Sequence, residues 1–128
     1  MTAPVYRKKE RMVSRKLIET LFSGGSSLSM AAFPLRVVYL KTERPSGEAP
    51  VQLLISVPKK RFKHAVDRNR VKRQIREAYR LHKQLLYNTL QPAEQLLMAF
   101  VWLSDSHQPT EMVERRVVNL MQRIAEKS

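Results

Sequence analysis

The chain has 128 residues with 43% apolar content and a formal net charge of +13, so it is long enough for one domain, residues 1–128, that buries its own core. With no cysteine it has no disulfide framework, thiolate nucleophile or cysteine-based zinc site, which favours a reducing compartment. Its longest apolar run, residues 96–103, is too short to span a bilayer and residues 1–12 lack the apolar segment of a secretion signal, so we expect a cytoplasmic location without membrane contact.

The first half of the chain predicts a basic arm, a short helix and two or three strands. Residues 1–11 are basic and show no apolar periodicity, so we expect a flexible arm. The stretch SRKLIETLFSGG, residues 14–25, predicts a helix that its first serine caps and two glycines end. Residues 33–42 and 51–57 predict strands by their alternation, and we expect these two to pair as a hairpin. Residues 26–31 are compatible with a further short strand.

The second half predicts a long helix, a buried strand and a closing helix. Asp67 is a candidate N-terminal cap for a helix that runs to about Asn88. Residues 95–102 form a nearly continuous apolar run, which is typical of a strand buried on both faces. Residues 110–125 carry apolar residues at helical spacing and predict a helix that packs on the core. The expected order is helix, two or three strands, helix, strand, helix.

The positive charge is concentrated in two segments. Residues 1–16 carry six Lys and Arg residues against one Glu, and residues 59–83 carry eleven against one Asp and one Glu, so their net charges are +5 and +9. The other 87 residues sum to −1. Concentrated charge on an otherwise neutral body indicates a surface that binds a polyanion.

Helical geometry places the apolar and the basic residues of the long helix on separate faces. At 100° per residue, six apolar residues lie within about 120° of arc and predict a core-facing stripe. They are Val71, Ile75, Ala78, Tyr79, Leu85 and Leu86. Four polar residues lie within about 60° of one another and predict a ridge along the helix. They are Asn69, Arg73, Arg76 and Arg80, with Lys72 and Lys83 beside them, whereas Arg70 and Glu77 point elsewhere.

A ridge of one charge sign favours nucleic-acid binding over a merely solubilising face, because a solubilising face costs least when both signs are interspersed. Arginine forks grip phosphate oxygens, and the first turn of the helix, Arg68–Asn69–Arg70, adds free N–H groups that favour an anion. Lys59, Lys60, Arg61 and Lys63 reach the same surface from the preceding strand. A strand rather than a second helix precedes the basic helix, which favours structured RNA over a helix-turn-helix contact with DNA.

Candidate catalytic groups are scattered along the chain. The histidines, His64, His82 and His107, have no metal-ligand spacing, and the sequence has no glycine-rich phosphate loop. The three carboxylates nearest the basic helix, Asp67, Glu77 and Glu94, lack the pairing that two-metal chemistry needs. If an activity resides here, we expect another molecule to supply its chemistry.

Residues 62–76, FKHAVDRNRVKRQIR, resemble the signature of the bacterial ribonuclease P protein component. That signature has a hydrophobe, two residues, Ala, two residues, Arg-Asn, a basic residue, an aliphatic residue, two basic residues, any residue, an aliphatic residue and a basic residue. The preceding strand with its Lys59–Lys60 pair, the short helix ending in Phe22, the apolar strand and the closing helix extend the resemblance to about residues 7–125.

The resemblance implies a protein that binds a large catalytic RNA and helps it to remove the 5′ leader from precursor tRNA. In that family the RNA performs the hydrolysis with bound Mg²⁺, so no catalytic or metal-binding residue is expected here, and the free protein is expected to be monomeric. The implied RNA contacts are Lys59, Lys60, Arg61, Arg68, Asn69, Arg70, Lys72, Arg73, Arg76 and Arg80. The implied leader-binding cleft, between the first helix and the sheet, has the candidates Phe22, Phe33, Arg36 and Tyr39.

The family fold is an α/β structure of the α+β sandwich type. It has a central, mostly antiparallel sheet of three to four strands packed with three helices, in the order α-β-β-(β)-α-β-α. Its strand–helix–strand crossover at the basic helix is left-handed, against the general preference. The chain departs from the family pattern at Ile18, where relatives often have an aromatic residue, and at Pro34, which alters the start of a strand. We therefore expect leader stacking to be weaker or differently placed.

Two other functions are compatible with the basicity. A ribosomal or ribosome-assembly protein would sediment with ribosomal particles and leave leader removal unchanged. A transcription factor would bind one duplex DNA more tightly than structured RNA.

Overall fold

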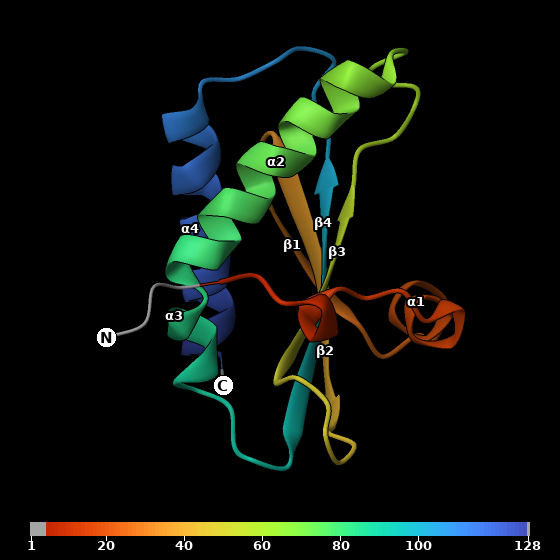
Figure 1. Ribbon diagram of the computed structural model, residues 1–128, viewed down its shortest axis with the longest axis vertical. Helices are drawn as coiled ribbons and strands as arrows, with labels where there is room; N and C mark the ends of the chain where they lie inside the picture. Colours follow the sequence, from red (N-terminus) through yellow and green to blue (C-terminus); the bar gives the residue numbers. More distant parts are fainter. Residues whose placement is uncertain (1–4, 128) are drawn as a thin grey trace.

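The computed structural model describes residues 5–127. In chain order its elements are η1 (Lys8–Glu10), α1 (Arg15–Ser23), β1 (Leu28–Ala32), β2 (Leu35–Glu43), β3 (Val51–Ser56), α2 (Ala65–His82), α3 (Gln84–Tyr87), β4 (Glu94–Trp102) and α4 (Thr110–Glu126) (Figure 1). No helix in this part of the chain is long and apolar enough to cross a membrane.

The four strands form one sheet in the order β1-β2-β4-β3. β2 pairs antiparallel with both β1 and β4, and β3 pairs parallel with β4. The expected α+β architecture with a mostly antiparallel sheet is confirmed, including the short extra strand. α2 lies in the crossover from β3 to β4, and the left-handedness that the resemblance implies for this crossover stays a prediction.

The expected hairpin between residues 33–42 and 51–57 is wrong, because β4 lies between β2 and β3. Val37 of β2 pairs with Phe100, and Leu53 of β3 pairs with Met98 on the other side. β2 forms its hairpin with β1 instead, across a turn with a cis peptide bond at Phe33–Pro34. The strand with the most continuous apolar run takes the centre of the sheet, where both of its faces are covered.

Helices cover both faces of the sheet (Figure 1). α2 and α4 pack on one face over a large apolar cluster that includes Tyr79, Phe100 and Trp102. α1 packs on the other face over a smaller cluster that includes Leu21 and Val38. The Ser14 hydroxyl accepts a hydrogen bond from the Leu17 N–H, at 3.3 Å, so the predicted cap of α1 is confirmed.

The segment before α1 is packed against the sheet. Residues 1–4 of the predicted flexible arm lie outside the described residues, but the prediction is wrong for residues 7–11. Arg11 makes a parallel bridge with Leu53, and the Met12 N–H donates to the Leu53 carbonyl at 2.9 Å. Glu10 and Met12 are buried, so this segment covers the exposed edge of β3.

α2 begins earlier and ends earlier than the sequence predicts. Its N-cap is His64 rather than Asp67. Asp67 lies in the first turn, where the helix dipole stabilises a carboxylate. The helix ends at His82, and α3 follows after the single residue Lys83. The predicted continuous helix to about Asn88 is therefore two helices, and their junction is occupied by contacts to the N-terminal segment.

Candidate nucleic-acid interface

The apolar and polar faces of α2 are separated as the sequence predicts. Val71, Ile75, Ala78 and Tyr79 are buried in the core. Asn69, Arg70, Arg73 and Arg76 are exposed, and Lys72 is half-buried. The core stripe fixes the rotation of the helix, so the outward direction of the cations follows from packing rather than from the cations themselves.

A buried glutamine on α2 escaped the sequence analysis. The Gln74 Nε2 group donates to the Gln108 carbonyl at 3.2 Å and to the Thr110 hydroxyl at 2.9 Å. These bonds join α2 to the first residue of α4. Position 74 follows the apolar residue Val71 at helical spacing, which is a signal that places it beside the core stripe.

Arg80 of the predicted ridge and its neighbour Lys83 are engaged within the protein. The Arg80 guanidinium donates to both carboxylate oxygens of Glu77, at 3.0 and 2.9 Å, and this contact lowers the pKa of Glu77. The Lys83 ammonium donates to Glu10 at 2.7 Å. Glu77 thus neutralises one end of the row, contrary to the expectation that it points away from it.

The cations nearer the start of α2 are available to a ligand. Within residues 5–127, no hydrogen bond or ion pair engages the side chains of Arg70, Lys72, Arg73 or Arg76. Arg68 differs, because its guanidinium donates to the carbonyls of Phe62 and Lys63, at 2.8 and 2.9 Å. Arg68 therefore fixes the turn that precedes α2 while its neighbours face outward.

The loop between β3 and α2 is braced by the loop before α4. Lys59 and Lys60 are exposed, whereas Arg61 is half-buried and its guanidinium lies 3.2 Å from Asp105. The Phe62 ring stacks on His107, with ring centroids 4.5 Å apart, and His107 Nε2 lies 3.0 Å from the Asp67 carboxylate. The basic loop and the first turn of α2 are thus held on one rigid surface.

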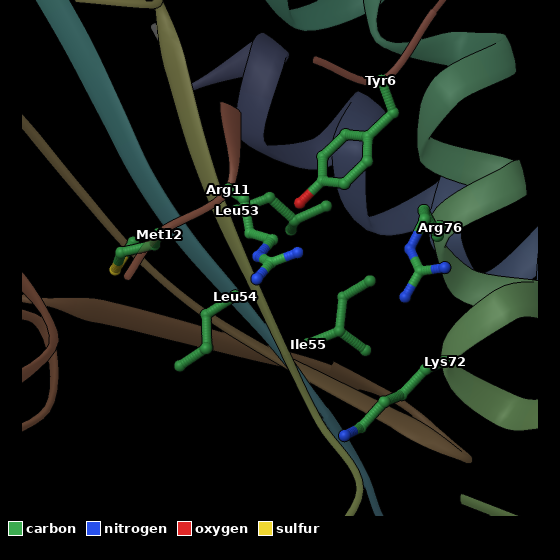
Figure 2. Close-up of a pocket in the computed structure, with 8 residues that line it drawn as sticks. All are labelled: Tyr6, Arg11, Met12, Leu53, Leu54, Ile55, Lys72 and Arg76. Atoms are coloured by element: carbon green, nitrogen blue, oxygen red, sulfur yellow. The ribbon is translucent and has the colours of Figure 1, made fainter. Parts of the chain in front are cut away.

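A pocket of about 410 Å³ opens between α2, β3 and the N-terminal segment (Figure 2). Its lining residues are Tyr6, Arg11, Met12, Leu53, Leu54, Ile55, Lys72 and Arg76. Figure 2 shows the side chains of Arg11, Lys72 and Arg76 directed into this space, over a floor of β3 side chains. Tyr6 and Arg11 were missed by the sequence analysis, because they fall in the predicted arm. The cluster of basic residues in residues 1–16 was the one signal for them.

The four candidates for the leader-binding cleft do not form one site. Phe22, 45% exposed, lies on the last turn of α1, and Arg36 is exposed on β2 with the parity of Val38, which faces α1. Tyr39 has the opposite parity and is buried in the core under α4, so it is wrong as a cleft residue. Phe33, 61% exposed, follows the last residue of β1 and lies about 17 Å along the strand from Leu28, where the chain enters β1 after α1.

Histidines and carboxylates meet only in pairs in the described part of the chain. His82 Nε2 lies 2.8 Å from Glu114, which joins α2 to α4, and His107 pairs with Asp67. Residues 5–127 contain no group of three His, Cys, Asp or Glu side chains that could hold a metal ion. The chemistry that this surface supports is the binding of an extended polyanion.

Comparisons with known proteins identify the family of the chain. Residues 6–125 match the family model described as Ribonuclease P. A ribonuclease P protein component from Porphyromonas gingivalis is 42% identical over 98% of this chain and 92% of its own length. One from Chlorobium phaeobacteroides is 43% identical over 63% of this chain and 56% of its own length.

Two solved structures share the fold. The ribonuclease P protein of Thermotoga maritima has a TM-score of 0.68 and 22% identity, over 89% of this chain and 96% of that chain. The Staphylococcus aureus ribonuclease P protein has a TM-score of 0.63 and 21% identity, over 91% of this chain and 95% of that chain. By its sequence relatives and its family match, the chain belongs to the bacterial ribonuclease P protein component family, the protein subunit of a ribonucleoprotein endoribonuclease.

Proposed function

We propose that the chain binds the catalytic RNA of ribonuclease P through one basic surface, made of Arg70, Lys72, Arg73 and Arg76 on α2 with Lys59 and Lys60 before it. The observation that carries this proposal concerns Arg70, Arg73 and Arg76, which are exposed, and Lys72, which is half-buried. Within residues 5–127 their side chains make no hydrogen bond or ion pair, and the opposite face of the helix is packed in the core. Because the helix is fixed, little backbone order has to be created when RNA binds.

In this proposal the RNA performs the hydrolysis with Mg²⁺ that the RNA itself holds. The two carboxylates on α2 support this division of labour, since Asp67 is paired with His107 and Glu77 with Arg80. The substrate is precursor tRNA, and the protein is a monomer when free. A cysteine-free chain suits a reducing compartment, and we propose the cytoplasm as its location.

One reconstitution tests the function. Purified protein, the catalytic RNA of the same host and a labelled precursor tRNA are combined at low Mg²⁺, and the released leader is measured. The protein alone is expected to cleave nothing, and its addition to the RNA is expected to raise the cleavage rate. A protein that sediments with ribosomal particles, or prefers one duplex DNA, while leaving this rate unchanged would contradict the proposal.

We further propose that Phe22 contacts the single-stranded 5′ leader. Phe22→Ala is expected to weaken binding of leader-bearing substrate more than binding of mature tRNA, since base stacking contributes about 1–3 kcal/mol per base. Phe33→Ala removes a ring of similar exposure at the far end of β1, so we expect a smaller effect from it. The measurement is the affinity of the reconstituted enzyme for both RNAs. Equal losses for the two RNAs would mark Phe22 as a packing residue only.

A further inference from the structure

Glu10 is the one charged side chain that is fully buried in residues 5–127, with 1% of its surface exposed. Its carboxylate accepts hydrogen bonds from the Arg7 N–H at 2.6 Å and from the Lys83 ammonium at 2.7 Å. It also accepts from the Tyr79 hydroxyl at 3.3 Å and from the Tyr87 hydroxyl. A buried ionised carboxylate is tolerated only with such partners, so this arrangement is specific.

One of the four donors, the Arg7 N–H, belongs to the N-terminal segment, and the other three lie at the junction of α2 and α3. Tyr79 lies near the end of α2, Lys83 is the single residue between α2 and α3, and Tyr87 ends α3. The Lys83 ammonium also donates to the Val5 carbonyl at 2.5 Å, and the Tyr6 ring packs edge-on against Tyr79. Glu10 therefore clamps residues 5–10 onto the junction of α2 and α3.

Glu10 stays ionised at neutral pH in this site. Burial alone raises its pKa, but the bonds from the Arg7 N–H, Lys83 and Tyr87, with the Lys83 charge, lower the pKa below the ordinary value. Burial, together with the neighbouring Glu10 carboxylate, raises the pKa of both tyrosines, which remain protonated donors.

The residue after Glu10 completes the pocket of Figure 2. Arg11 is held at the β3 edge by its bridge to Leu53, one position from the clamp. Its guanidinium faces Lys72 and Arg76 of α2 across the pocket, and the Tyr6 hydroxyl points into the same space (Figure 2). None of the lining residues is acidic. Three converging cations are suited to a phosphate group, which guanidinium forks bind bidentately.

We propose that Glu10 is a positioning residue for RNA binding, which fixes residues 6–12 so that Arg11 joins Lys72 and Arg76 in a pocket for one backbone phosphate of the partner RNA. This inference rests on the proposed function of the α2 surface. Without the clamp, Arg11 would lie on a segment that must be ordered when RNA binds, at a cost in conformational entropy.

Glu10→Gln tests the proposal, because a net-charge effect and a positioning effect would change RNA affinity in opposite directions. The substitution keeps the size of the side chain and raises the net charge of the protein by one. If charge alone mattered, RNA would bind more tightly. If Glu10 positions Arg11, affinity for the catalytic RNA is expected to fall by about threefold to tenfold, and the slope of log affinity against log salt is expected to flatten by about one unit.

Two further variants separate positioning from a general loss of structure. Arg11→Gln is expected to give the same change in slope. The double variant is expected to show no further change, because both substitutions remove the same contact between Arg11 and a phosphate. Amide hydrogen exchange at Met12, whose N–H bonds to Leu53, is expected to accelerate in Glu10→Gln while exchange in β4 is unchanged. Unchanged or tighter RNA binding by folded Glu10→Gln overturns the positioning role.

Failure of this inference is distinguishable from failure of the proposed function. The Arg73→Gln/Arg76→Gln variant is measured in the same salt titration. If that variant loses affinity while Arg11→Gln does not, the α2 surface binds RNA and the pocket proposal is overturned. If neither variant loses affinity, the proposed surface is itself wrong. Should Glu10→Gln not fold at the assay temperature, Arg11→Gln alone decides, and an unchanged slope for it overturns the pocket.

Discussion

Replacing Arg73 and Arg76 together by glutamine is expected to weaken binding of the catalytic RNA by about tenfold to a hundredfold at moderate salt. The slope of log affinity against log salt is expected to flatten by about one to two units, since binding releases roughly one counterion fewer for each phosphate contact that is lost. Both side chains are exposed and neither makes a hydrogen bond or ion pair within residues 5–127, so their removal leaves no buried group unsatisfied. The unfolding midpoint is therefore expected to stay nearly unchanged.

A matched control removes two charges that lie outside the proposed basic surface. Arg115 and Lys127 are exposed at α4 and beyond its end, and Arg115→Gln/Lys127→Gln lowers the net charge by the same amount. Long-range attraction depends on the total charge, whereas counterion release at a contact depends on where the charge lies. If the control flattens the slope as much as the α2 variant does, RNA does not lie on α2.

The faces of α2 could be predicted from the sequence because they depend on local periodicity. Val71, Ile75 and Tyr79 recur at helical spacing, and the structure buries all three. The sequence predicted less well which of the cations remain available to bind RNA. The pairing of Arg80 with Glu77 is local, at a spacing of three residues, but Lys83 is neutralised by Glu10, which is 73 residues away. A contact of that separation depends on the tertiary fold.

Strand partners were mispredicted for a related reason. The alternation in residues 51–57 identifies β3 as a strand but contains no information about which strand it meets. The continuous apolar run of β4 was the relevant signal, because a strand buried on both faces belongs in the middle of a sheet.

Two site residues could have been assigned better from the pattern alone. The polar residue Arg36 sits between Leu35 and Val37, so the odd-numbered positions of β2 face the larger core, and Tyr39 is one of them. Glu10 is the single acidic residue among the cations of residues 1–16, and an isolated carboxylate there indicates a specific partner. Neither pattern identifies the partner, which required the fold.

Phe100→Ala is expected to lower the free energy of unfolding by about 3–5 kcal/mol, the range for removing a buried aromatic ring. Phe100 is fully buried in β4, paired with Val37 of β2 and with Ile55 of β3. A loss of this size is a large part of the total stability of about 5–15 kcal/mol that a single domain has. Urea denaturation followed by circular dichroism measures it.

The comparison variant is Phe22→Ala, which removes the same ring from a half-exposed site on α1 and is expected to cost less than about 1 kcal/mol. For RNA binding the order of the two effects is expected to be reversed, with the larger loss of affinity for leader-bearing substrate in Phe22→Ala. At a temperature where Phe100→Ala is still folded, the α2 cations keep their positions, so its salt slope for the catalytic RNA should match that of the unchanged protein. A small loss of stability from Phe100→Ala would place β4 at an edge of the sheet, and the β3–α2–β4 connection that orients the basic surface would then have to be different.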